Sequence, residues 1–84
     1  MEYCIIMCRS LTYAQRAVRL LERENIHARL GKAPQGVTPG GCSYGVKVRA
    51  KDTERAIAHM SMGGIRRGKV FRFDANGKAV EVET

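Results

Sequence analysis

The stretch that decides the fold is Tyr3-Cys4-Ile5-Ile6-Met7-Cys8, a run of strand length without a charged residue. A strand with one face in water alternates apolar and polar residues, whereas a strand covered on both faces is apolar throughout. We therefore predict that 3–8 is the central strand of a sheet. The rest of the 84-residue chain then has to cover its two faces.

The residues that follow alternate between helical and strand patterns. Ser10 is a suitable N-cap for a helix with apolar residues at helical spacing, and Asn25 marks the end of that helix. The later patterns predict, in chain order, a strand over 26–30, a strand over 44–49, a helix that begins at Asp52 or Thr53 and ends at Gly63-Gly64, a strand over 70–73, and a hairpin return over 79–82 after the turn sequence Asp74-Ala75-Asn76-Gly77.

This order of elements predicts an α+β fold, the ferredoxin-like split βαβ sandwich, with two helices on one face of an antiparallel sheet. The length fits a single domain over 1–84, with a core over about 2–73 and a hairpin or tail over 74–84. In the usual strand order 4-1-3-2, the end of the first strand lies beside the start of the third. The fold therefore predicts that Cys8 and Cys42 come close together, beside the N-terminus of the first helix.

Fifteen basic and eight acidic residues give a net charge of +7, with one tight cluster at Arg66-Arg67-Gly68-Lys69. This charge favours anionic partners such as nucleic acid, phosphate metabolites or an acidic protein face. No apolar run is long enough for a membrane span and the first residues lack the layout of a signal peptide, so we expect a cytoplasmic protein. Three cysteines without a CxxC pair or zinc-finger spacing argue against a disulfide scaffold and a metal site. We expect reduced thiols and no cofactor.

Cys42 is the candidate functional residue, because it lies in the glycine-rich stretch 38–45, which we expect to be an exposed loop. A cysteine becomes reactive where it is exposed and where positive charge stabilises its thiolate. The first helix's N-terminus, Arg9 and Lys32 are expected to supply that charge and to lower the pKa of the Cys42 thiol. Nearby glycines let backbone amides approach a bound persulfide or selenide. These glycines are Gly40, Gly41 and Gly45. The alternative is that the glycines only form a tight entry into the following strand and that Cys42 has no functional role.

The other two cysteines share one face of the first predicted strand. Their separation of roughly 13 Å along a strand is too large for a mutual disulfide. We expect Cys4 to be a packing residue and Cys8 to be the candidate resolving thiol for Cys42. Cys4 and Ile6 are expected on the face that the helices leave open, which predicts a homodimer through the sheet.

Nucleic acid is a disfavoured partner, although an RNA-recognition domain shares this order of elements. If Tyr44 lay on the open face of the sheet, Lys47 and Arg49 would point into the core, where an unpaired charge is very costly. Tyr44 is therefore expected under the helices. The open face is then basic, without an aromatic platform for bases. Its cations are expected to be Lys47, Arg49 and Arg72.

Several features of the chain recur in one family of short bacterial and archaeal proteins: the opening Tyr3-Cys4-Ile5-Ile6, the helix pattern Ser10-x-x-x-Ala14-x-x-Ala17, Ile26 after that helix, and the loop from Pro34 to Cys42. Over roughly 2–73, the chain resembles the selenium/sulfur carrier-like family. The family loop typically has an arginine after its proline and a glycine after its cysteine, where this chain has Gln35 and Ser43. Lys32 is the candidate replacement for the charge of that arginine.

The resemblance implies a carrier that holds sulfur or selenium as a persulfide or perselenide on Cys42, with a cysteine desulfurase-like donor and an acceptor enzyme as partners. A carrier fits better than a stand-alone enzyme, because the sequence has no paired acids, nucleophile elbow or phosphate-binding P-loop. The alternative is a non-catalytic regulatory or assembly module that binds an anionic ligand or a partner protein. In such a module Cys42 is dispensable.

Overall fold

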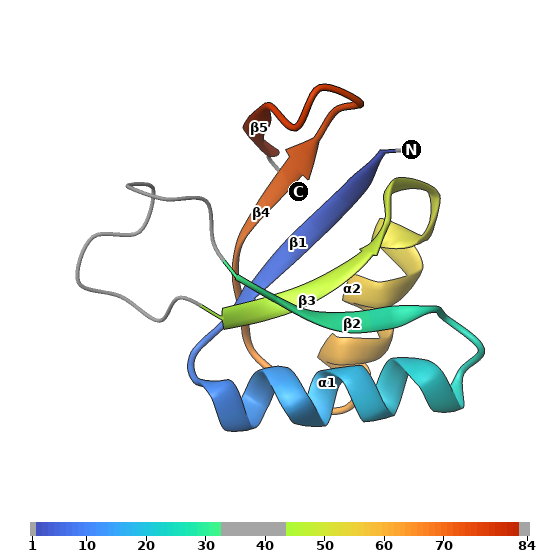
Figure 1. The fold of residues 1–84 in the computed structure, drawn as a ribbon. Coiled ribbons are helices and arrows are strands. Elements are labelled where there is room, and N and C mark those ends of the chain that lie inside the picture. The colour runs from blue at the N-terminus through green and yellow to red at the C-terminus, as the bar shows by residue number, and fades with distance from the viewer. Residues whose placement is uncertain (1, 33–43, 83–84) are drawn as a thin grey trace.

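The computed structural model describes residues 2–32 and 44–82. The elements, in chain order, are β1 (Tyr3–Cys8), α1 (Leu11–Arg23), β2 (Ala28–Lys32), β3 (Tyr44–Arg49), the short 3-10 helix η1 (Ala50–Asp52), α2 (Thr53–Met62), β4 (Arg67–Phe73) and β5 (Ala79–Val82). The described strands form one antiparallel sheet in the order β2-β3-β1-β4-β5 (Figure 1). The predicted ferredoxin-like α+β fold is confirmed, and β5 extends its sheet by one strand. Neither α1 nor α2, the two described α-helices, combines the length and apolar content that crossing a membrane requires.

β1 is the central strand, as its apolar run predicts. Ile6 is paired with Val46 of β3 on one side and with Val70 of β4 on the other. The five residues of β1 from Cys4 to Cys8 are each at most 4% exposed. An apolar strand without alternation is therefore covered on both faces.

Both helices cover the same face of the sheet, where they form the helix-side core. α1 contributes its buried residues Ala14, Ala17 and Leu21 to this core, and α2 contributes Ala56 and Met60. From β1, the residues Cys4, Ile6 and Cys8 join them. The expectation that Cys4 and Ile6 lie on a face left open by the helices is therefore wrong, whereas the homodimer itself stays a prediction.

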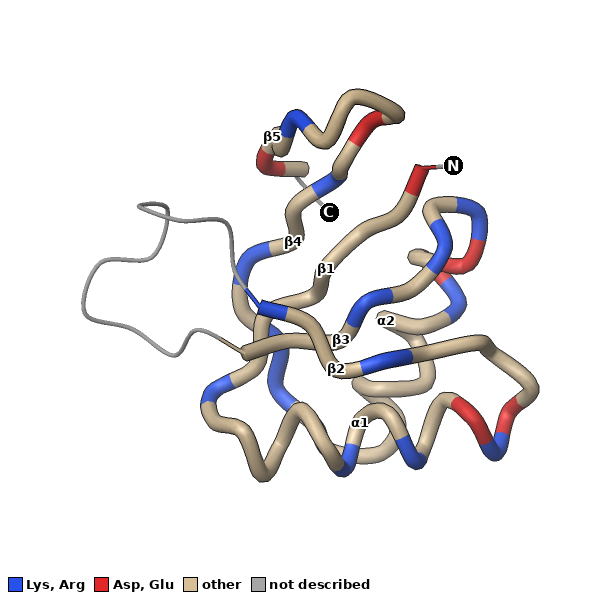
Figure 2. Tube along the Cα trace, in the orientation of Figure 1, with Lys and Arg blue, Asp and Glu red and all other residues tan. Residues whose placement is uncertain are grey.

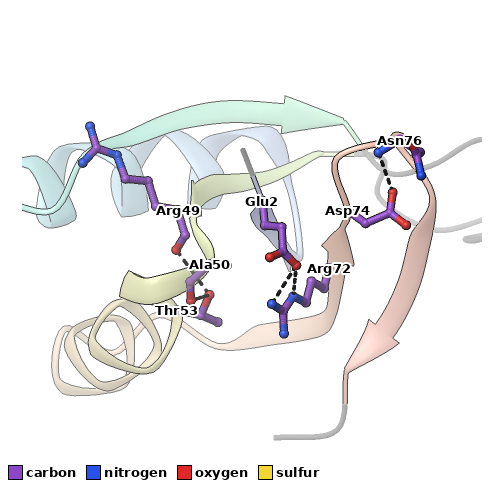
Figure 3. Close-up of polar contacts among 7 residues, drawn as sticks. All are labelled: Glu2, Arg49, Ala50, Thr53, Arg72, Asp74 and Asn76. Atoms are coloured by element: carbon purple, nitrogen blue, oxygen red, sulfur yellow. Dashed lines mark hydrogen bonds and ion pairs between the residues drawn. The ribbon is translucent and has the colours of Figure 1, made fainter.

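The opposite face of the sheet has a smaller core, the open-face cluster. It consists of Ile5, Met7, Phe71 and Phe73, with Tyr3 and Ala79 packed against it. These residues come from β1, β4 and β5, and neither described helix contributes to the cluster. The hairpin that brings in β5 is held by Asp74, whose Oδ1 accepts the backbone N–H of Asn76 at 2.9 Å (Figure 3). The same oxygen accepts the backbone N–H of Lys78, also at 2.9 Å. β5 thus helps to cover the second face of the central strand.

The helix ends follow their local sequence signals. The Ser10 hydroxyl accepts the backbone N–H of Tyr13 at 3.3 Å, as expected of an N-cap. Asn25 has a φ of 61°, the left-handed conformation in which a helix ends. Before α2, η1 is an element that the sequence pattern does not predict. The Thr53 hydroxyl donates a hydrogen bond to the Ala50 carbonyl oxygen at 2.9 Å, and this contact joins η1 to α2 (Figure 3).

Gly45 allows the close pairing of β3 with β1. A Cβ at this position would lie 2.5 Å from the Ile6 carbonyl oxygen and 3.0 Å from Ile5 Cγ2. Because backbone of the central strand is the obstacle, we expect Gly45→Ala to lower the free energy of unfolding by about 2 kcal/mol or more. Gly68→Ala is the matched control, since a Cβ there meets Met7 no closer than 3.5 Å. Equal guanidinium unfolding midpoints for the two variants would contradict this explanation.

Candidate functional site

Several elements meet at one end of the sheet, which we name the Cys8 end. β1 finishes there, and the N-cap of α1 follows two residues later. β2 finishes there and β3 begins, because Lys32 is the register partner of Tyr44. β4 also begins there, because Arg67 is the register partner of Cys8. The predicted neighbourhood of the first strand's end and the third strand's start is confirmed, since Met7 pairs with Gly45. The Cys8 end comprises Cys8, Arg9, Lys32, Tyr44 and Arg67.

Of the two cysteines expected to meet here, the structure describes Cys8. Its side chain belongs to the helix-side core and is 4% exposed. Its Sγ makes a weak hydrogen bond to the Ile6 carbonyl oxygen at 3.7 Å. The predicted site residues Cys42, Gly40 and Gly41 lie outside the described residues. Their roles stay predictions.

Gly45 is the one loop glycine of the prediction that the structure describes. It lies inside β3 and is buried. The close approach of the β1 backbone explains why this position has no side chain. Its glycine is therefore accounted for by strand packing.

A β-bulge places Arg67 beside Cys8. Ile6 is opposite Val70, whereas Cys8 is opposite Arg67, so the register shifts by one residue between them. Without this shift, Cys8 would be paired with Gly68. Arg67 is half-buried, and its Nη1 donates to the Gly68 carbonyl oxygen at 3.1 Å.

Sequence reasoning missed this pairing, because it begins the fourth strand at residue 70, whereas β4 begins at Arg67. One local signal was present. A glycine within a strand, here Gly68, often marks a bulge.

The Cys8 end carries positive charge from several elements. Arg9 directly follows β1, Lys32 is the last residue of β2, and both are exposed. They are the two cations expected to support the Cys42 thiol. Arg67 adds a third cation from β4. The N-terminus of α1 adds partial positive charge, and the first turn of that helix has no acidic residue. Charges of one sign in a small area raise the local potential.

The acidic residues that the structure describes lie mostly at the other ends of the elements (Figure 2). Those at the far ends are Glu2 before β1, Glu22 and Glu24 at the end of α1, Asp52 and Glu54 at the start of α2, and Asp74 after β4. Glu81 on β5 is the exception, and its carboxylate lies 3.7 Å from the Lys69 ammonium in an ion pair. The Cys8 end is therefore cationic, without a described acid among its own residues.

The predicted basic face of the sheet is confirmed for two of its three cations. Lys47 and Arg49 are exposed on the face away from the helices. Arg72 is not on that face, because it is the register partner of Cys4 and its guanidinium forms an ion pair with Glu2 at 2.7 Å (Figure 3). Tyr44 packs against the helix-side core, as predicted. The aromatic rings on this face, those of Tyr3, Phe71 and Phe73, belong to the open-face cluster.

No group of three or more His, Cys, Asp or Glu side chains within 2–32 and 44–82 is placed to hold a metal ion. At the Cys8 end, the described residues supply one buried thiol, that of Cys8, and the cations Arg9, Lys32 and Arg67.

The burial of the two described cysteines predicts slow alkylation. Cys4 is 3% exposed and Cys8 is 4% exposed, so a reagent reaches either thiol only when the structure opens locally. In a Cys42→Ser variant, we expect iodoacetamide to label neither thiol in the folded protein and both after denaturation. Peptide mass spectrometry measures the labelling. If Cys8 reacts in the folded protein as fast as in the denatured protein, its burial is contradicted.

Comparison with known proteins gives one match. A family model described as "Putative Se/S carrier protein-like" matches residues 3–72. The matched range runs from the start of β1 to Arg72 of β4, so it includes Cys42 and every residue of the Cys8 end, and it stops before β5. Searches of curated proteins and of solved structures found no match.

Proposed function

The chain belongs to the Se/S carrier protein-like family, and from this membership we propose that it carries sulfur or selenium on Cys42 as a persulfide or perselenide. The observation that best supports the proposal is the cationic Cys8 end. Cys42 precedes Tyr44 by two residues, and two residues of chain span at most about 7 Å. A tether of this length lets a carrier thiol on Cys42 reach the cations of that end, and this supports the proposal.

Loading is a sulfur exchange between two cysteines. The Cys42 thiolate attacks the terminal sulfur of a persulfide on a cysteine desulfurase-like donor. The S–S bond of the donor breaks, its cysteine leaves as a thiolate, and Cys42 retains the S–SH group. A nucleophile on the acceptor enzyme then attacks the same terminal sulfur and releases the Cys42 thiolate. The electrons balance within each exchange, so the carrier needs neither an oxidant nor a cofactor.

Arg9, Lys32 and Arg67 assist the exchange through their charge. Positive charge near a thiol increases the fraction that is ionised, and the thiolate is the nucleophile. The same cations attract an acidic docking surface on the donor or the acceptor, and this attraction weakens as salt is added. We place the carrier in the cytoplasm, where cysteine thiols stay reduced.

Sulfur loading tests the proposal directly. Incubation with a cysteine desulfurase and cysteine is expected to add one sulfur atom to Cys42, and mass spectrometry of the intact protein and its peptides detects it. Lys32→Gln should slow loading by about threefold or more at low salt, because it removes a cation at the Cys8 end.

The matched control is Arg19→Gln, which removes one exposed cation from the middle of α1. Its loading rate should stay within about twofold of the parent. Cys42→Ser should remove loading altogether. An active desulfurase that leaves Cys42 unmodified would contradict the carrier function.

Cys8 is the proposed resolving thiol. Its thiolate attacks the Cys42 sulfur, a Cys8–Cys42 disulfide forms, and the terminal sulfur leaves as hydrosulfide. Because Cys8 is 4% exposed, this step requires local opening of the Cys8 end. Cys8→Ala should therefore lengthen the lifetime of the Cys42 persulfide severalfold, as followed by mass spectrometry over time. Cys4→Ala, a similarly buried control at the other end of β1, should leave it unchanged; equal lifetimes in the two variants would exclude the resolving role.

A further inference from the structure

A second group of cations surrounds a cavity on the open face of the sheet. The cavity has a volume of about 400 Å³ and lies over β1, β2 and β3. Its described lining consists of Tyr3, His27, Arg29, Lys47, Val48 and Arg49. Two arginines and a lysine therefore meet at one hollow, and none of the described lining residues is acidic.

The cations of this cavity repel one another across the strands. Arg29 of β2 is the register partner of Lys47 of β3, so two like charges lie directly opposite. Such a pair destabilises an antiparallel sheet. The ion pairs found among the described residues involve neither Arg29 nor Lys47 nor Arg49. The repulsion is therefore not offset by the carboxylates of the described chain.

Glu2 lies next to Tyr3 in sequence, but its carboxylate is engaged elsewhere. It accepts hydrogen bonds from Arg72 at 2.7 and 3.0 Å. In Figure 3, the Arg49 side chain extends away from this pair. The guanidinium of Arg49 remains able to bind an external anion.

The only aromatic side chain of the described lining cannot stack on a nucleobase. Phe73 stacks on the Tyr3 ring, with centroids 4.8 Å apart and planes 9° apart. The Lys47 ammonium lies 4.1 Å from the centroid of the same ring. Because β4 and β3 flank β1 on opposite sides, Phe73 and Lys47 reach Tyr3 from opposite sides. Both faces of the ring are occupied, so a ligand of this cavity is held by charge.

We propose that this cavity binds a small anion through a phosphate group. Arg29 and Arg49 supply planar guanidinium groups, whose paired N–H donors match phosphate oxygens. Lys47, held over Tyr3, supplies a third positive charge, and a bound dianion offsets the repulsion between Lys47 and Arg29. A concave site of this volume suits a small molecule better than a flat protein surface. The site uses no residue of the Cys8 end and does not depend on the carrier function.

An NMR titration of the ¹⁵N-labelled protein tests the proposal. The probes are inorganic phosphate and glycerol phosphate, with sodium chloride at matched ionic strength as the reference. We expect the chemical shifts of the amides around the cavity to change and to saturate with at least one phosphate probe. Tighter binding of inorganic phosphate would indicate a free phosphate ligand, and tighter binding of glycerol phosphate would indicate a phosphate ester. Arg29→Gln and Arg49→Gln should each weaken binding by about tenfold. Arg19→Gln, which removes an exposed cation from α1, should change it less than twofold.

Three outcomes would overturn the proposal. The first is that sodium chloride causes the same amide chemical-shift changes, or that these changes do not saturate as the phosphate probe is added. The second is an equal loss of affinity in Arg19→Gln, since binding would then follow net charge alone. The third is tighter binding of polyglutamate than of either phosphate probe at the same amides, which would assign the cavity to an acidic protein.

As a readout independent of ligand, Arg29→Gln should raise the thermal midpoint in phosphate-free buffer, because it removes the like-charge pair.

Discussion

The structure depends on one requirement: both faces of β1 have to be removed from water. Burying one large aliphatic side chain contributes about 1.5–3 kcal/mol, and β1 presents Ile5, Ile6 and Met7 in succession. The helices cover the face that carries Ile6. Phe71 and Phe73 of β4, with Ala79 of β5, cover the face that carries Ile5 and Met7. Because this second face of β1 also has to be covered, β5 has a structural role beyond the four-stranded ferredoxin-like core.

The same central strand positions the candidate chemistry. β1 ends at Cys8 and leads directly into the N-cap of α1, while β3 and β4 begin on either side of it. The bulge in β4 then brings Arg67, rather than Gly68, opposite Cys8. Since the described acids lie mainly at the far ends of the elements, the cations where β1 ends have no described carboxylate among them. The open-face cavity is a separate cationic site, because its residues come from the start of β1 and the facing parts of β2 and β3.

The order of the elements and of the strands follows from local patterns in the sequence. The alternation in β3, the Ser10 cap and the turn before β5 each depend on residues close together in the chain, so the sequence predicts them well. The orientation of β1 does not follow, because a strand without alternation carries no signal for its two faces; Cys4 and Ile6 face the helices instead. The neighbours of Cys8 and Arg72 depend on the register of β4 against β1, and those of Cys8 depend also on a single bulged residue. The charged cavity beside Tyr3 likewise arises only when three strands are aligned.

The central claim is that the cationic Cys8 end activates Cys42, and the most direct test is the rate of its alkylation by iodoacetamide as a function of pH. A variant with Cys4→Ala and Cys8→Ala retains Cys42 as its single cysteine, and the same variant unfolded in urea provides the reference. The account predicts that the folded protein reaches half of its maximal rate at a lower pH than the unfolded protein. It also predicts that Lys32→Gln moves this midpoint upward. Identical midpoints in the folded and unfolded protein would contradict activation of Cys42 by the fold.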